Sequence, residues 1–198
     1  LLEKTDPLDA AVLQRFGQER QPAPTPPPSP ALHELTDLLM ARHAIVEQIS
    51  AFRLRNSLVS PVTRRALRSV VLGLRRQRLA LEHALARWLE SPAADPWRDK
   101  VYTLCLAPGV GVLSALGLIG YLPELGTLNR RQAAKLAGLA PLPWDSATLK
   151  GVRRIQGGRA PVRRTLYLCA VVAARWHEPT RQLYRQLRQR GKPAPVAY

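Results

Sequence analysis

Acidic residues are scarce in this sequence. Its 198 residues include 14 Asp and Glu against 30 Lys and Arg, which leaves a formal net charge of +16 and a pI near 11.2. This excess is more than solubility requires, and it favours a polyanionic partner, either a nucleic acid or an anionic membrane surface. Lysine is also rare, so most of the charge comes from Arg, whose planar guanidinium can bind phosphate in a bidentate manner. A GC-rich genome explains the excess of Arg over Lys equally well, but it does not explain the shortage of acids.

Cysteine and long apolar runs are scarce as well. The only cysteines, Cys105 and Cys169, lie far apart within apolar helical stretches, so we expect buried, reduced thiols. No Cys/His cluster has the spacing of a zinc site, and the 4 scattered histidines are expected to be structural or surface residues. No apolar run is long enough for a membrane-spanning helix, and the N-terminus lacks the layout of a signal peptide. A membrane-surface protein is also disfavoured, because no amphipathic face is rich in Trp or Phe.

Prolines divide the chain. Residues 1–20 are interpreted as the tail of a preceding domain, with a helical pattern over 6–16 that Gly17 is expected to end. Residues 21–30 hold six prolines, which can pack neither as a helix nor as a central strand. We therefore expect a semi-rigid, extended linker at 21–30.

Residues 31–90 carry two long amphipathic patterns. Apolar residues recur at alternating three- and four-residue spacings over 31–59 and again over 62–90, as in a coiled-coil heptad. The seam residues are Leu35, Leu38, Ile45, Ile49, Phe52 and Val59, then Leu67, Val71, Leu74, Leu81, Leu85 and Trp88, with polar breaks at Arg42, Asn56 and Arg78. We predict an antiparallel coiled-coil hairpin that serves as an arm, a spacer or a dimerisation surface. A helical pair packed on the rest of the chain is the alternative.

Residues 97–198 follow a second linker at 91–96 and are long enough to bury a small core. Strand signals are weak throughout this region. Apolar periodicity predicts helices near 98–106, 112–119, 129–137, 161–177 and 179–190. The predicted fold class is therefore mostly α, with the hairpin followed by a small helical domain.

A Pro-Gly-Val-Gly turn separates two of these apolar helices. Its glycines, Gly109 and Gly111, allow a tight turn, and the helix that follows would present free N–H groups to a phosphate. The element resembles a helix-hairpin-helix, whose phosphate contacts are independent of base sequence. An ordinary turn between two helices is the alternative.

The C-terminal region is strongly basic. Between Lys150 and Lys192 there are twelve Lys or Arg and one acid, Glu178. A solvated basic face is the usual outcome of such a run, but this one is too one-sided for that interpretation to be favoured. The expected phosphate-binding cations cluster around the pair Gly157-Gly158. They are Lys150, Arg153, Arg154, Arg159, Arg163 and Arg164.

Two further positions are ambiguous from the residues alone. Ser146 could cap or turn the chain, and no His lies nearby in the sequence to act as a base if it were a nucleophile. Asp6 and Asp9 could complement the dipole of a helix that begins there, or they could face one metal ion. Two carboxylates are too few for a catalytic pair of Mg²⁺ ions.

The order of these motifs resembles that of insertion-sequence one-ten family transposases, also called DEDD transposases. The resemblance covers nearly the whole chain. It implies an N-terminal RuvC-like domain of α/β fold, here represented only by its tail at 1–20, a coiled-coil arm at 31–90 and a C-terminal transposase domain at 97–198. The motifs that carry it are Lys-Thr-Asp-Pro-Leu-Asp-Ala at 4–10, Leu-Ala-Pro-Gly-Val-Gly at 106–111, Gly-Leu-Ala-Pro at 138–141 and Arg-Arg-Thr-Leu-Tyr at 163–167.

The resemblance also implies chemistry. Family members are recombinases that excise and insert their element, some of them guided by a structured bridge RNA. Asp6 and Asp9 match the last two of the four carboxylates that bind Mg²⁺, and Ser146 matches by position the serine that attacks DNA. The implied partners are DNA, a guide RNA and further copies of the chain. The implied location is the bacterial cytoplasm, in association with the nucleoid.

Two departures from the family pattern matter. The family serine is typically followed by Gly, whereas Ala147 follows here. The first two carboxylates of the metal site have no counterpart, so a truncated product, a fragment or a decayed copy is expected. A non-enzymatic nucleic-acid-binding protein, in which the helix-hairpin-helix element and the arginines bind phosphate without cleavage, is the alternative function.

Overall fold

Helices dominate the fold, as the sequence predicts. The computed structural model describes residues 6–22, 24, 27–56, 58–143 and 153–198. Its elements are α1 (Asp6–Arg20), α2 (Pro30–Asn56), α3 (Pro61–Glu90), the 3₁₀ turn η1 (Pro92–Ala94), α4 (Asp95–Cys105), α5 (Val112–Tyr121), α6 (Arg130–Leu136), β1 (Pro141–Pro143), β2 (Arg153–Ile155), α7 (Ala160–Trp176), α8 (Glu178–Gln189) and α9 (Ala194–Ala197). The mostly α fold class is thereby confirmed.

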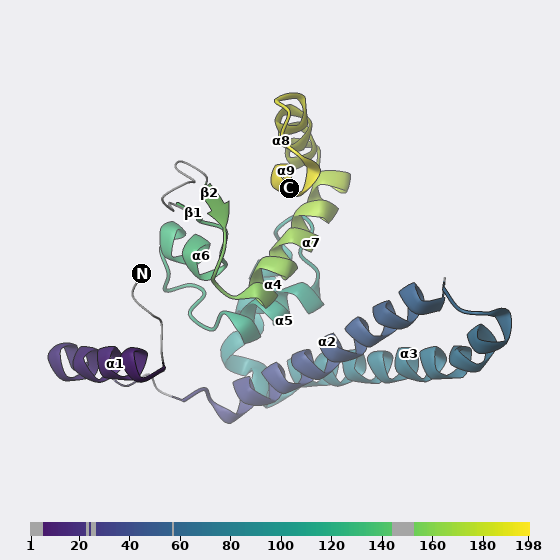
Figure 1. Cartoon of the computed structure of the whole chain (residues 1–198), viewed down its shortest axis with the longest axis horizontal. Coiled ribbons are helices and arrows are strands. Elements are labelled where there is room, and N and C mark those ends of the chain that lie inside the picture. The colour runs from purple at the N-terminus through teal and green to yellow at the C-terminus, as the bar shows by residue number, and fades with distance from the viewer. Residues whose placement is uncertain (1–5, 23, 25–26, 57, 144–152) are drawn as a thin grey trace.

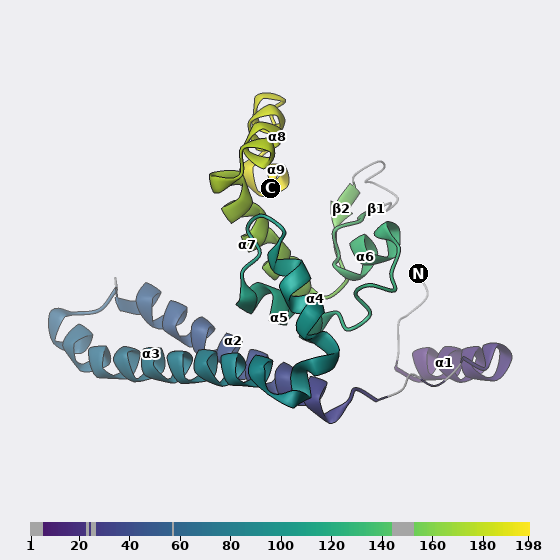
Figure 2. The same cartoon turned by 180° about the vertical axis from the view of Figure 1, so that it is seen from behind.

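The two longest helices, α2 and α3, lie side by side and run in opposite directions. Together they project away from the remaining helices (Figures 1 and 2). Helix α3 begins where its sequence dictates, because Ser60 caps it by accepting a hydrogen bond from the Thr63 N–H, and Pro61 occupies the first turn. The packing of this pair as a coiled coil stays a prediction.

The main core lies at the base of the hairpin. There the first turns of α2 and the last turns of α3 meet α4 and α5, and the buried residues form one cluster. Its members are Leu32, Leu35, Leu39, Leu85, Trp88, Leu89, Ala94, Val101, Ala115, Leu116 and Ile119. Burying this apolar surface anchors one end of the hairpin and leaves the other end free of the helical body.

Polar seam residues of the hairpin pair within the chain. The Arg42 guanidinium donates to Glu82 Oε1 at 2.9 Å from Nε and 2.6 Å from Nη2. The Nε of Arg78 lies 3.7 Å from the same oxygen. Arg42 therefore links α2 to α3 inside one chain and helps to fix their register.

A smaller core joins α5, α6 and α7. Leu118, Leu122, Ala137 and Val162 are buried together in it. Helix α6 starts with a capping box, in which Asn129 accepts from the Gln132 N–H and the Gln132 side chain accepts from the Asn129 N–H. This second core places α6 against the start of α7.

Helix α1 lies apart from the other helices in both views (Figures 1 and 2). Its residues from Pro7 to Arg20 are all exposed, including apolar side chains such as Phe16 at 53%. The expectation that Gly17 ends this helix is wrong, because α1 continues to Arg20. An interior glycine costs a helix only about 1 kcal/mol, and Pro22 is the stronger terminator.

The described strands form one small antiparallel pair. Pro141 lies opposite Ile155, Leu142 opposite Arg154, and Pro143 opposite Arg153. Weak strand signals in the sequence are consistent with strands this short. No helix in the described ranges has the length and apolar character needed to cross a membrane.

Candidate nucleic-acid interface

Gly109 packs against the backbone of α7. Its φ of +84° lies in the left-handed region, and a Cβ added there would be 2.3 Å from the Cys169 carbonyl oxygen and 2.8 Å from the Ala173 nitrogen. Only glycine fits this position. The close approach that Gly109 permits is therefore to another helix of the same chain, although the sequence suggested an approach to phosphate.

Gly111 has a different environment. It precedes α5 with φ at −95°, and a Cβ added there would meet no atom within 4 Å. The first N–H groups of any helix lack intrahelical partners, and here Val112 and Leu113 in that turn are 43% and 37% exposed. The space beside Gly111 is therefore open, but anion binding there, as in a helix-hairpin-helix, stays a prediction. The assignment of that motif itself stays a prediction.

The backbone at Gly138 and the backbone at Gly158 pass so close to each other that neither position has room for a Cβ. A Cβ on Gly158 would lie 2.3 Å from the Gly138 nitrogen, 2.5 Å from its Cα and 2.7 Å from the Leu136 carbonyl oxygen. The Arg159 N–H donates to that same carbonyl at 2.7 Å. This crossing ties together the two ends of the segment 139–157, which carries Ser146, so the Gly-Leu-Ala-Pro motif and the Gly-Gly pair act as one structural clamp.

Arg159 is held within the fold. Its Nη1 and Nη2 donate to the two carboxylate oxygens of Glu124, each at 2.6 Å, and Nη1 also donates to the Tyr121 carbonyl at 3.0 Å. The hydrogen bonds from Arg159 lower the pKa of Glu124, and the same pairing raises the pKa of Arg159. Arg159 thus joins the start of α7 to the segment after α5, and its guanidinium is already engaged by a carboxylate.

Arg163 and Arg164 have different hydrogen-bond and ion-pair partners. Arg163 Nη1 donates to the Gly157 carbonyl at 2.7 Å while its residue is half-buried. Arg164 contacts the ring of His43 and lies 3.5 Å from Glu47 Oε1, which is itself 3.0 Å from His43 Nε2. Arg164 therefore links α7 to α2, the first helix of the hairpin.

A shallow basic hollow lies beside these arginines. It has a volume of about 320 Å³ and is lined by Ala160, Arg163, Arg164, Tyr167 and Pro195. Two guanidinium groups and a phenol in one open hollow suit a phosphate group. The sequence showed Tyr167 only as part of the 163–167 motif. It gave no sign of Pro195, because the C-terminal segment is brought there by Tyr198, which gives no local signal.

Three tyrosines hold that C-terminal segment in place. Tyr198 stacks on Tyr184 at a centroid distance of 4.4 Å and meets the edge of Tyr167 at 5.7 Å. Hydrogen bonding to Tyr184 raises the pKa of Tyr198. The contacts dock the end of the chain against α7 and α8.

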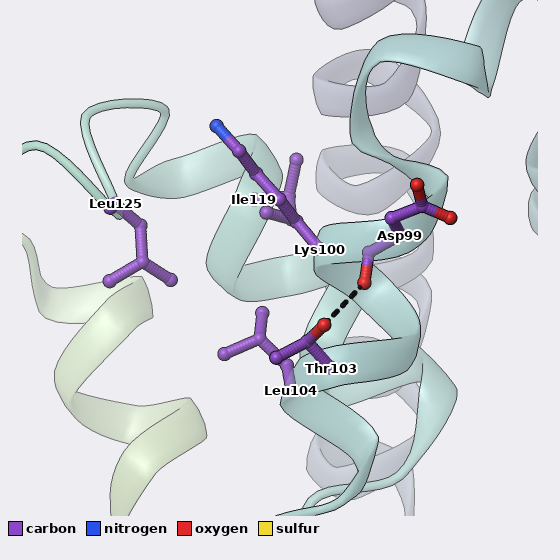
Figure 3. A pocket seen from close by; sticks show the side chains of 7 residues that line it. Asp99, Lys100, Thr103, Leu104, Ile119 and Leu125 are labelled. Carbon is purple, nitrogen blue, oxygen red and sulfur yellow. Dashed lines mark hydrogen bonds between the residues drawn. The ribbon is translucent and has the colours of Figure 1, made fainter.

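An apolar cavity of about 270 Å³ lies between α4, α5 and the segment after α5 (Figure 3). Leu104, Ile119 and Leu125 face it, and Lys100 extends along its rim. The one hydrogen bond drawn there joins the Thr103 hydroxyl to the Asp99 carbonyl at 2.7 Å, within α4. None of the residues that the sequence singled out lines this cavity.

The remaining candidate residues are only partly described. Ser146 and Lys150 lie outside the described residues, in the stretch between β1 and β2. Arg153 and Arg154 belong to β2. Asp6 is the first residue of α1, and Asp9 follows one turn later with an exposed side chain.

These acids do not by themselves fit a magnesium site. Within the described ranges no group of three or more His, Cys, Asp or Glu residues is placed to hold a metal ion. Two carboxylates on one exposed helix leave most of the coordination of Mg²⁺ to other ligands. The described part of the chain therefore offers at most part of a metal centre.

Comparison with known proteins gives one consistent result. Residues 102–185 match the model described as the transposase IS116/IS110/IS902 family. The protein y4rJ of Sinorhizobium fredii (strain NBRC 101917 / NGR234), named as a transposase, is 35% identical over 114 residues, which is 50% of this chain and 28% of that protein. The chain thus spans 28% of the length of this relative.

The matched region is the one built above. It begins in α4 and ends in α8, so it contains the Gly109 loop, the Gly138–Gly158 clamp and every arginine named around them, whereas α1 and the hairpin lie outside it. Residues 102–185 thus match the IS116/IS110/IS902 family of transposases, the family that the sequence motifs resemble.

Proposed function

We propose that this chain takes part in DNA transposition and supplies the serine nucleophile that cleaves and transfers the DNA strand. The observation that carries this proposal is the Gly138–Gly158 crossing within a transposase-family region, because it clamps the two ends of the segment that contains Ser146. A nucleophile must be held close to its reacting geometry, and the crossing fixes the two ends of the segment that carries Ser146.

The proposed reaction is a phosphoryl transfer. The Ser146 oxygen attacks the phosphorus of a DNA phosphodiester and loses its proton, while the bond from phosphorus to one sugar oxygen breaks and that oxygen leaves as a hydroxyl. The product is a phosphoserine link between protein and DNA. Attack on that link by the hydroxyl of another strand restores the serine and joins the new strand, so no external oxidant or energy source is needed.

Cations from this region would stabilise the negative charge on the oxygens of the reacting phosphate. Arg163 and Arg164 are the described arginines that line the basic hollow, and we assign them this role. Lys150, Arg153 and Arg154 belong by sequence to the same segment and its second strand, and we assign them the same role. Arg159 is assigned instead to holding the clamp, because Glu124 occupies its guanidinium.

Asp6 and Asp9 are proposed as two ligands of Mg²⁺ in the complete protein. Magnesium would act there as a Lewis acid on phosphate oxygens. The described residues supply too few carboxylates for the ion, so other ligands would complete its coordination, and no step above depends on α1. A structured guide RNA and further copies of the chain are proposed partners in the same way.

The test is a search for covalent protein–DNA product. The chain would be produced both alone and in frame with the coding sequence upstream of Leu1, then incubated with DNA of the element ends, with and without Mg²⁺. A labelled adduct that survives denaturation and disappears in Ser146→Ala, but persists in the exposed-helix control Ser50→Ala, supports the assignment. An adduct of wild-type yield in Ser146→Ala contradicts it.

A second function is favoured by one observation. Because the described residues hold no complete metal site, nucleic-acid binding without cleavage is the alternative. Binding that is strong, sensitive to salt and indifferent to Mg²⁺, with no adduct from either form of the protein, would identify this function.

A further inference from the structure

The two helices of the hairpin differ sharply in charge. Helix α2 balances three arginines with three carboxylates, whereas α3 has seven arginines and two glutamates. The segment 61–81 of α3 carries six of those arginines and no acid. The positive charge of the hairpin is therefore concentrated on one helix, outside the family-matched region 102–185.

Most of these arginines are not needed by the fold. Arg64 closes the turn by donating to the Asn56 and Val59 carbonyls, and Arg78 faces Glu82 in the seam. The other five are exposed, and within the described ranges their guanidinium groups have no ion-pair or hydrogen-bond partner. They are Arg65, Arg68, Arg75, Arg76 and Arg87.

The cost of this arrangement lies within α3 itself. Like charges three or four residues apart destabilise a helix by about 0.2–0.5 kcal/mol per pair, and Arg65 with Arg68 and Arg75 with Arg78 are such pairs. Glu82 offsets part of the repulsion at Arg78, whereas Arg65 and Arg68 have no carboxylate beside them in the segment 61–81. A polyanion laid along α3 would relieve the repulsion.

The spacing of the arginines suits a long, straight partner. Arg65, Arg76 and Arg87 recur every eleven residues, which is close to three helical turns, so they share one face at intervals of about 16 Å. The helix as a whole extends about 45 Å. Duplex DNA presents phosphates continuously over such a length.

The same face argues against other partners. The aromatic residue of α3, Trp88, is buried at 4% exposure, so this helix offers no platform on which single-stranded bases could stack. Leu72 and Leu79 are 43% and 47% exposed beside the arginines, yet a second copy of this face would bring arginine against arginine.

We infer that the exposed arginine face of α3 binds the phosphate backbone of duplex DNA, so that the hairpin acts as a DNA-contacting arm beyond the transposase domain. The inference rests on the proposed function only in naming DNA as the polyanion. The contact reads no base sequence, because it is made to phosphates alone. Its role is to position the duplex along the arm.

The test measures how affinity for DNA depends on salt. A duplex of about 30 base pairs exceeds the roughly 13 base pairs that α3 would span. Each phosphate contact that is lost should reduce the slope of log affinity against log salt by about 0.9. The double variant Arg65→Gln/Arg76→Gln should therefore reduce the slope by about 1.8.

A matched control removes the same charge from the other helix. Arg53→Gln/Arg55→Gln changes two exposed arginines of α2 and should leave the slope nearly unchanged. Arg65→Lys/Arg76→Lys keeps the charge on α3 and should keep the slope. All four positions are exposed, so the variants are expected to fold, and the helical circular dichroism of each one checks this.

The outcomes separate the inference from the proposed function. The inference is overturned if the α3 and α2 variants give equal slopes. It is also overturned if the α3 variant lowers the slope equally on a single-stranded oligonucleotide, or if the chain binds duplex RNA more tightly than duplex DNA at the same salt. The measurement uses the Ser146→Ala chain, whose binding does not depend on cleavage. Failure to form the covalent adduct therefore leaves the salt-dependence result intact. Equal slopes, in turn, would not affect the assignment of Ser146.

Discussion

Two adjacent glycines allow the clamp around Ser146 to be tested with an internal control. Gly157 and Gly158 have nearly the same backbone conformation, with φ at +67° and +62°. A Cβ on Gly157 would meet no atom within 4 Å, whereas a Cβ on Gly158 would lie 2.3 Å from the Gly138 nitrogen. Substitution by Ala should therefore cause nearly the same backbone strain at both positions, but a close contact with the Gly138 backbone only at Gly158.

The magnitudes follow from that difference. The left-handed conformation costs a non-glycine residue about 1–2 kcal/mol, and the reduced freedom of the unfolded chain returns about 0.5–1 kcal/mol, so Gly157→Ala should cost about 1 kcal/mol. Gly158→Ala adds the overlap with backbone atoms that cannot rotate away, about 1–3 kcal/mol. It also strains the hydrogen bond from Arg159 to Leu136, so its total cost should be about 3–4 kcal/mol.

Thermal and urea unfolding of the two variants would measure the difference. For a chain of this size about 1 kcal/mol corresponds to about 2–4 °C in Tm, so Gly158→Ala should fall roughly 10 °C below wild type and Gly157→Ala about 3 °C below it. Equal losses of stability at the two positions would refute the crossing of Gly138 and Gly158 as described.

Three further predictions follow. Gly109→Ala should destabilise the chain by about 3 kcal/mol, since its Cβ would overlap the backbone of α7, and unfolding in urea measures this. Glu124→Gln should cost about 0.5–1 kcal/mol near pH 7, allowing for partial exposure of the pair. Because Arg159 lowers the pKa of Glu124, that contribution is complete above the ordinary carboxylate pKa and is lost as the pH falls through the lowered pKa of the folded chain, so the two proteins should converge in stability only at a pH below the ordinary carboxylate pKa. Gly73→Ala should stabilise α3 by about 0.5–1 kcal/mol, because nothing lies within 4 Å of the added methyl group, and an unchanged or lower Tm would contradict this.

The helices could be predicted from the sequence because their boundaries are written locally. Ser60-Pro61 begins α3, Asn129 begins α6, and apolar periodicity marks the stretches between them. The prediction that Gly17 ends α1 was wrong, because a glycine only weakens a helix, whereas the proline after α1 ends it. Local chemistry of this kind is visible in a single sequence.

The partners of the site residues could not be predicted. Arg159 and Glu124 lie 35 residues apart, and Arg42 and Glu82 lie 40 apart, so only the folded chain brings them together. The glycines were found from the sequence, but periodicity does not show whether the space beside a glycine holds a phosphate or a neighbouring backbone. For Gly109 and Gly158 it holds backbone, and for Gly111 it is open.

The central claim is that Ser146 forms a covalent link to DNA, and one measurement tests it most directly. Mass spectrometry of nuclease-treated adduct, prepared from the chain joined to its upstream coding sequence, would locate the nucleotide remnant. We predict a phosphodiester remnant on the peptide that contains Ser146, and none in Ser146→Ala. A remnant on any other residue, or DNA strand transfer at wild-type yield by Ser146→Ala, would contradict the account.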